Sequence, residues 1–231
     1  SIPLPDISST GLKWNTNGRD SGHGSKIYIA NNANSTHFTK YVSELKNKGI
    51  DSVWIPPPTK AQTPEDTGYG IYDLYDLGEF DQNGSVRTKY GTKDELVEAI
   101  EACRENDICV YADVVMNHKA GADETERFKV IEVDQNNRTK EISGPFDIDG
   151  WTKFTFPGRG DTYSSFKWNV EHFNGTDYDE GTIRTGIFKI LGEHKGWNDN
   201  VDHEFGNYDY LMFANIDYNH PSVREEMIEW G

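Results

Sequence analysis

One pattern constrains the fold of this chain most: an amphipathic helix followed at once by a short apolar strand. In its first copy, Asn34–Thr36 would start a helix whose apolar side chains recur at helical spacing from Phe38 to Leu45. Gly49 ends that helix, and an apolar strand follows directly over Ile50–Pro56. A run this short and this apolar is typical of a strand covered on both faces.

The second copy of the pattern has clearer ends. Thr92 and Glu95 have the spacing of a capping box, in which each side chain bonds a backbone amide at the helix start. Apolar residues follow at helical spacing as far as Cys103, and a second buried strand is predicted over Ile108–Val115. These two units, with a weaker strand over Lys26–Ala30, predict an α/β fold with a parallel sheet.

A long interval separates these units from the next helix, which Pro221 begins. About 100 residues lie between, too many for a loop, so they must form a subdomain. Their richness in Gly, Asp, Asn and aromatic residues, and the period-two alternation over Trp151–Gly158, predict an irregular antiparallel β subdomain. We expect one turn at Asp147–Gly150 and another at Gly206–Asp209.

Charge and composition exclude several classes of protein. The 231 residues include 23 Lys+Arg and 39 Asp+Glu, a net charge of −16 at pH 7, which argues against nucleic acid or a membrane surface as a partner. Aromatic residues make up 13%, enough for a packed core, and no apolar run is long enough for a membrane span. The two cysteines, Cys103 and Cys109, do not make a disulfide scaffold and are expected to be buried thiols.

The first candidate for chemistry is Asp113–His118, at the carboxyl end of the second predicted strand. Functional residues gather at that end of a parallel sheet because the loops leave the sheet there. An acid, an amide and an imidazole together offer a metal ligand, a hydrogen-bond donor and a charge. The alternative is a set of polar side chains that only caps the strand end.

Two further segments are weaker candidates. The loop Gly68–Phe80 is dense in Tyr and Asp, which suits sugars because aromatic rings stack on pyranose faces and carboxylates accept hydroxyl hydrogens. Ordinary surface turns have much the same composition. An oxygen-rich group in the second half could bind a hard cation such as calcium, or could be a solvated acidic surface. Its members are Asn174, Asn198, Asp199, Asp202, Asp209, Asn215, Asp217 and Asn219.

These segments together resemble the α-amylase family, and most of all its liquefying bacterial members. The resemblance covers residues 36–231, whereas residues 1–35 match poorly. The motifs that carry it are, in chain order, Val53–Pro57, Gly68–Phe80, Asp113–Lys119, Phe156–Gly160, Phe166–Trp168 and Gly206–Met212.

The resemblance implies a (β/α)8 TIM barrel with the irregular β subdomain, called domain B, inserted after the third strand. Residues 1–117 would be the first part of the catalytic barrel, 118–208 domain B, and 209–231 the return to the barrel at the start of the third helix. It also implies endo-hydrolysis of α-1,4-glucosidic bonds with retention of configuration. The implied partners are starch or maltooligosaccharide and the remainder of the barrel.

The resemblance assigns roles to single residues near the cleavage point. His118 would bind the sugar there and Tyr69 would stack beneath it, while Asp113 would be a buried structural acid. The family's nucleophile, its acid/base Glu and its third catalytic Asp lie on later strands, and no segment here matches them. Glu79 and Asp113 cannot replace them, because a retaining glycosidase needs two carboxyls about 5 Å apart. No catalytic residue is therefore assigned.

The metal site departs from the family pattern. The family builds a calcium–sodium–calcium cluster largely from aspartates, and the loss of negative ligands weakens cation binding. We expect a single calcium ion, held by Asn117, Asp209 and Asn215, that links the barrel to domain B. The alternative is a metal-free subdomain closed by hydrogen bonds between asparagines. Four of the positions that match the cluster are amides: Asn174, Asn198, Asn215 and Asn219.

Two functions follow as hypotheses. The chain is expected to be the N-terminal portion of an α-amylase-type glycoside hydrolase, inactive alone, that supplies substrate contacts and calcium ligands. The alternative is a truncated, non-catalytic α-glucan-binding or accessory chain. Another activity of the same superfamily, such as transglycosylation, stays open.

Overall fold

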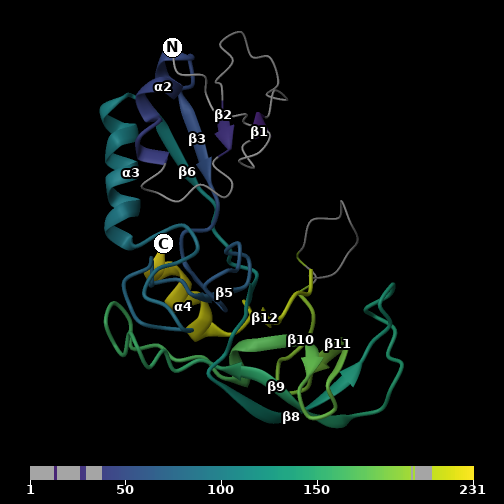
Figure 1. Cartoon of the computed structure of the whole chain (residues 1–231). Helices are drawn as coiled ribbons and strands as arrows, with labels where there is room; N and C mark the ends of the chain where they lie inside the picture. The colour runs from purple at the N-terminus through teal and green to yellow at the C-terminus, as the bar shows by residue number, and fades with distance from the viewer. Residues whose placement is uncertain (1–12, 15–26, 30–37, 199, 201–209) are drawn as a thin grey trace. The chain divides into compact units, whose positions relative to one another are not determined.

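The chain forms two compact units (Figure 1). The first comprises residues 1–69 and 76–114, and the second comprises residues 70–75 and 115–231. The predicted domains 1–117, 118–208 and 209–231 stay a prediction. This computed structural model describes the following residues: 13–14, 27–29, 38–198, 200 and 210–231.

A four-stranded sheet forms the frame of the first unit, in the order β1-β2-β3-β6. β2 pairs with β3 and β3 with β6 in parallel, with Val53 opposite Val110, while β1 pairs antiparallel with β2. The predicted weak strand and both predicted apolar strands are thus confirmed. The strands are β1 (Lys13–Trp14), β2 (Ile27–Ile29), β3 (Ser52–Ile55) and β6 (Cys109–Ala112), and a short strand β4 (Lys60–Ala61) lies in the following loop.

Helices α2 (Val42–Asn47) and α3 (Lys93–Glu105) belong to the same unit (Figure 1). The capping box is confirmed: the Thr92 hydroxyl accepts from the Glu95 amide, and the Glu95 carboxylate accepts from the Thr92 amide at 2.8 Å. The predicted helix start Asn34–Thr36 lies outside the described residues. One core joins helices and strands: Phe38, Val42, Leu45, Ile50, Val53, Ala99, Cys103 and Ile108.

Strand β6 differs from its prediction as a strand covered on both faces. Tyr111 is 56% exposed and Cys109 is exposed, so the prediction of two buried thiols is right for Cys103 and wrong for Cys109. The reason is topological: within the part of the chain that the structure describes, β6 has a strand neighbour on one side only.

The second unit is built on a six-stranded antiparallel sheet in the order β7-β12-β10-β11-β8-β9. This confirms that the long interval is an antiparallel β subdomain. The unit also contains β5 (Ile71–Asp73), the 3-10 turn η1 (Val170–His172) and α4 (Pro221–Trp230), which Pro221 begins as predicted. The strands of the sheet are β7 (His118–Lys119), β8 (Glu124–Glu132), β9 (Phe146–Lys153), β10 (Phe173–Asp179), β11 (Arg184–Ile190) and β12 (Ala214–Ile216).

The turn predicted at Asp147–Gly150 is wrong, because these residues lie inside β9. Asp149 forms an ion pair with Arg127 of β8 at 3.2 Å, while Gly150 lies so close to the Phe128 ring that a Cβ atom would be 2.4 Å from it. The acids therefore line the solvent side of a strand, and the glycine makes room for an aromatic ring on the other side. The turn predicted at Gly206–Asp209 lies outside the described residues.

Aromatic side chains dominate the core of the second unit. Phe154, Phe173 and Phe188 are fully buried, and Val223 and Met227 of α4 belong to the same cluster. Within the described ranges, no helix is long and apolar enough to cross a membrane.

Candidate functional site

Tyr69 and Asp113 meet in the first unit. The prediction that Asp113 is buried is wrong, because the residue follows the exposed strand β6 and is only half-buried. The Tyr69 hydroxyl donates to Asp113 Oδ2 at 2.8 Å, and the Asp113 amide donates to the Ile55 carbonyl at 3.1 Å. Burial, and then the Asp113 carboxylate, raise the pKa of Tyr69 to about 12. The ring itself stays 40% exposed. Asp113 therefore fixes an exposed aromatic ring that remains a neutral hydrogen-bond donor over the whole physiological pH range.

The loop that carries Tyr69 is held by close backbone contacts. Gly68 has a φ of +104°, and a Cβ atom there would lie 2.7 Å from the Pro57 carbonyl oxygen, so only glycine fits. The Gly68 amide donates to Asp66 Oδ1 at 2.8 Å, and the Tyr90 hydroxyl donates to the Thr67 carbonyl at 2.8 Å. Tyr69 is thus presented by a rigid turn.

A buried ion pair organises the rest of this loop. Lys60 is 3% exposed, and its ammonium donates to the Phe80 and Val86 carbonyls at 2.9 and 2.6 Å and lies 3.4 Å from Asp76. The fully buried Asp76 carboxylate also accepts from the Glu79 amide at 2.8 Å. Backbone groups and a counter-ion satisfy both charges, as a buried pair requires.

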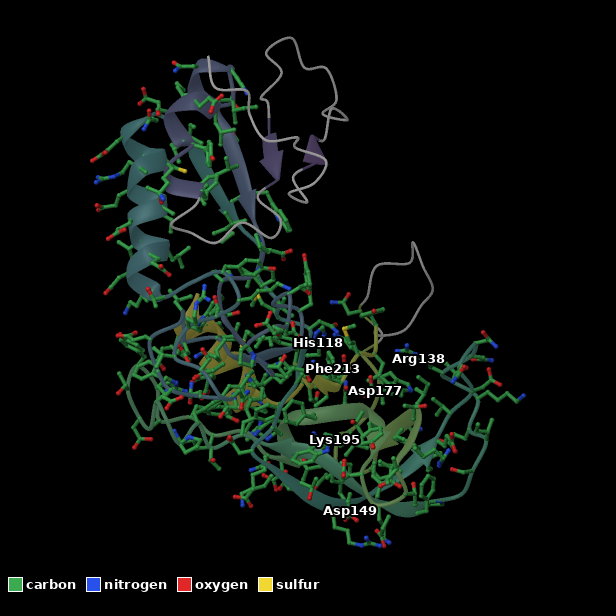
Figure 2. All side chains as sticks on the ribbon, viewed as in Figure 1. His118, Arg138, Asp149, Asp177, Lys195 and Phe213 are labelled. Atoms are coloured by element: carbon green, nitrogen blue, oxygen red, sulfur yellow. The ribbon has the colours of Figure 1, made fainter. Side chains whose placement is uncertain are left out.

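His118 and Asn117 lie in the second unit. The Asn117 amide Nδ2 donates to the Tyr210 carbonyl at 2.9 Å and lies 3.2 Å from His118 Nδ1. Since an amide nitrogen can only donate, His118 Nδ1 accepts and Nε2 carries the imidazole proton. The His118 ring is 5% exposed and lies 5.6 Å from the Phe213 ring (Figure 2).

Lys119, the next residue, is a buried cation that sequence reasoning quoted but gave no role. Its side chain is 2% exposed, and Nζ donates to the Tyr72 carbonyl at 2.6 Å. Nζ also lies 5.0 to 5.3 Å from three aromatic ring centroids, those of Phe154, Phe156 and Trp168. Burial lowers the pKa of Lys119 to about 8, so the aromatic faces and nearby carboxylates stabilise a charge that water no longer solvates.

Asp73 and Arg159 form a second buried pair beside this cation. Arg159 Nε donates to Asp73 Oδ2 at 2.7 Å, and both side chains are at most 2% exposed. The guanidinium also donates to the Thr162 and Ser164 carbonyls at 2.6 and 2.9 Å, which shapes the loop after Phe156. In the sequence, Arg159 stands between two glycines, and this pattern does not identify its partner.

The described members of the predicted calcium site do not fit a cation. Asn215 Nδ2 donates to Asn174 Oδ1 at 2.7 Å, and the Asn117 amide is engaged with Tyr210 and His118. Amide side chains bring no negative charge to a cation site, and calcium affinity falls as the charge of its ligands falls. Across the described ranges, no group of three or more His, Cys, Asp or Glu side chains could hold a metal ion. Asp209 lies outside the described residues, so the calcium ion stays a prediction.

The predicted site residues that the structure describes fall into two groups. Tyr69 and Asp113 meet in the first unit, whereas Asn117 and His118 adjoin Asn215 on paired strands of the second, where His118 lies opposite Asn215.

Comparison with known proteins gives consistent matches. The family "Alpha amylase, catalytic domain" matches residues 38–231. Glucan 1,4-alpha-maltohexaosidase of Bacillus sp. (strain 707) is 52% identical over 206 residues, which are 88% of this chain and 40% of that protein. The alpha-amylase of Bacillus licheniformis is 56% identical over 187 residues, which are 81% of this chain and 36% of that protein. The chain thus spans 36 to 40% of the length of these relatives.

Among solved structures, truncated alternansucrase from Leuconostoc mesenteroides NRRL B-1355 is 22% identical with a TM-score of 0.48, over 57% of this chain and 13% of that chain. That likeness is too partial to add to the argument. The catalytic domain of the matched family is that of a TIM-barrel glycosidase, and the parallel strands and helices of the first unit agree with it. Because the family match spans residues 38–231 and bacterial members are more than half identical over most of the chain, this chain belongs to the alpha-amylase family.

Proposed function

We propose that this chain is part of an enzyme that hydrolyses internal α-1,4-glucosidic bonds of starch-like glucans with retention of configuration. The family match over residues 38–231 carries the proposal. The local geometry supports it, because an exposed tyrosine ring is held rigidly at the end of a parallel strand, where a sugar ring can stack on it. In the complete protein this chain forms the first strands of a (β/α)8 barrel and its domain B.

Tyr69 and His118 are the sugar contacts in this proposal. The Tyr69 ring offers an apolar face, and its orientation is fixed by the bond to Asp113. His118 is proposed to hydrogen-bond a glucose hydroxyl through its imidazole ring. The two residues act by binding and orientation, and no step of the proposal passes through a metal ion.

The catalytic carboxylates are proposed to come from other segments of the complete enzyme. The two acids that were considered as replacements are already engaged: Asp113 accepts from Tyr69, and Glu79 pairs with Lys93 at 2.8 Å. A nucleophile and an acid/base must instead face the scissile bond from both sides. This chain alone should therefore bind glucan without cleaving it.

Binding of maltohexaose to the 231-residue chain, followed by NMR titration, tests the sugar contact. We expect a dissociation constant of about 1 mM, a loss of about tenfold in Tyr69→Ala, and retention in Tyr69→Phe, which keeps the ring. Tyr111→Ala removes a similarly exposed tyrosine of the same unit and should leave binding unchanged. No binding by the wild-type chain, or equal binding by Tyr69→Ala, would overturn the assignment of Tyr69.

Starch hydrolysis by the same chain, with and without calcium, tests the assignment of the catalytic groups. No new reducing ends are expected in either condition. Cleavage would show that the carboxylates lie within these 231 residues.

The second candidate function is a non-catalytic glucan-binding chain, which the exposed, immobilised Tyr69 ring would serve equally well. The two functions predict different genes: only the enzyme requires that the gene also encodes the catalytic carboxylates. Sequencing beyond the codon for Gly231 and finding the family's catalytic carboxylates favours the enzyme, and their absence favours the binding chain.

A further inference from the structure

Two buried asparagines of the second unit bond to each other. Asn174 of β10 and Asn215 of β12 are 1% and 2% exposed, and Asn215 Nδ2 donates to Asn174 Oδ1 at 2.7 Å. The Asn174 amide donates in turn to the Gly196 carbonyl at 3.0 Å. Asn174 reaches this position because the pairing of β10 with β12 shifts between Phe173 and Gly175, which leaves Asn174 as the extra residue of a bulge.

Lys195, the residue before Gly196, forms an ion pair in the same region. Lys195 is 10% exposed, and its ammonium lies 2.9 Å from Asp217 Oδ2 and also donates to the Glu171 carbonyl (Figure 2). Asp217 follows β12 directly, two residues after Asn215. Hydrogen bonds therefore join residues 195–196 to β10 and to the turn η1, and an ion pair joins them to the residue that follows β12.

The charges of these groups are complete without an added cation. The two amide side chains are neutral and are joined by one hydrogen bond, and Asn198 Oδ1 accepts from the Asn200 backbone N–H at 3.0 Å. The remaining buried carboxylate, Asp217, already faces an ammonium. A divalent ion at that carboxylate would have to displace Lys195 or sit beside it, and like charges at such a distance repel strongly in a buried site.

We propose that the Asn174–Asn215 amide pair and the Lys195–Asp217 ion pair close this part of the second unit in place of a divalent cation, so that the unit folds and keeps its stability without calcium. The ammonium is a cation built into the chain, and the amides replace ligands that a metal would need as carboxylates. This inference does not depend on the proposed glucan hydrolysis, since it concerns the folding of the second unit alone.

Thermal unfolding of the 231-residue chain, in EDTA and in about 5 mM calcium chloride, is the first test. We expect the two Tm values to agree within about 1 °C. A calcium site filled at one hundred times its dissociation constant would raise Tm by about 5–10 °C, and a rise of that size would overturn the proposal. Isothermal titration of calcium into the metal-stripped chain should give no stoichiometric binding heat, and one bound ion per chain would overturn it equally.

Lys195→Met tests the ion pair. Breaking a buried pair leaves Asp217 uncompensated, so Tm should fall by about 6 °C or more in EDTA. The matched control is Lys189→Met, which removes an exposed pair with Glu141 in the same unit and should lower Tm by about 2 °C at most. Equal decreases in Tm for the two substitutions would show that the Lys195–Asp217 pair does not stabilise the unit, and would overturn the proposal. If Lys195→Met does not fold, Lys195→Arg keeps the cation and must retain calcium-independent unfolding.

Discussion

The two units of this chain protect their sheets in different ways. In the second unit an antiparallel sheet of six strands is covered by its own segments, so Phe154, Phe173 and Phe188 are fully buried. In the first unit the last described strand of a parallel sheet, β6, leaves Tyr111 56% exposed. An antiparallel strand finds its partner across a short connection, whereas a parallel strand needs partners that are distant in the sequence.

The two units also differ in where their buried charges lie. Both units contain buried ion pairs at loops, among them Lys60–Asp76 in the first and Arg159–Asp73 in the second. In the second unit the pair is joined by Lys119 among three aromatic rings, inside the core itself. The second unit therefore has its own closed core. The first unit is stabilised by a helix cap and by the Lys60–Asp76 pair in its loop, while its strand β6 stays exposed.

The largest effect is expected from a core truncation in the second unit. Phe154→Ala should lower the free energy of unfolding by about 3–5 kcal/mol, because the fully buried ring packs on Phe173 and lies 5.0 Å from the Lys119 ammonium. Tyr111→Ala in the first unit should cost about 0.5 kcal/mol or less. Urea unfolding combined with hydrogen exchange resolved by peptide measures both, and equal losses would break the comparison.

A somewhat smaller loss is expected when the buried pair of the second unit is broken. Arg159→Ala should cost about 3 kcal/mol, at the low end for such a pair because the Lys119 charge remains near Asp73. Arg127→Ala removes the exposed pair with Asp149 and should cost about 0–1 kcal/mol. Urea midpoints of the two variants decide the point. An Arg159→Ala protein as stable as Arg127→Ala would mean that the core does not need this charge.

The helix cap of the first unit should have an intermediate effect. Thr92→Ala removes the hydroxyl that accepts from the Glu95 amide, and we expect a loss of about 1 kcal/mol with faster hydrogen exchange in α3. Thr92→Ser keeps the hydroxyl and should behave like the wild-type chain. If exchange in the second unit accelerates as much as in α3, the two units do not unfold independently.

The smallest perturbation uses the cysteines as probes of β6. At pH 8 a thiol reagent should modify exposed Cys109 at least about a hundredfold faster than Cys103, whose pKa burial raises to about 11. Below that pKa the Cys103 thiol stays protonated, so its reaction should require unfolding in urea. Cys109→Ser is the control that leaves one slow thiol, and rapid reaction of both thiols would show that the core of the first unit is open.

Much of the fold was predictable from the sequence because its signals are local. The α3 cap needs only Thr92 and Glu95, and the start of α4 needs only Pro221. The length of the interval before α4 was enough to predict a subdomain. For the candidate site, the motifs singled out Tyr69, Asp113, Asn117 and His118, whose roles stay predictions, and the hydrogen bond between Tyr69 and Asp113 was not predicted.

Other features required the tertiary structure. Asp147–Gly150 is a strand because Lys129 and Arg127 lie opposite its acids and Phe128 fills the space above its glycine. The partner of Arg159 is 86 residues away along the chain, and the bond between Asn174 and Asn215 spans 41 residues. No local pattern encodes such pairs.

The sequence by itself therefore determined where α3 and α4 begin, which runs are the parallel strands and which family the motifs resemble, since propensity, capping and residue order are properties of short segments. Only the tertiary structure decided which strand stays exposed, which cations are buried, and which amides bond to each other. Burial and pairing depend on what the rest of the chain brings close, and that is a property of the folded molecule.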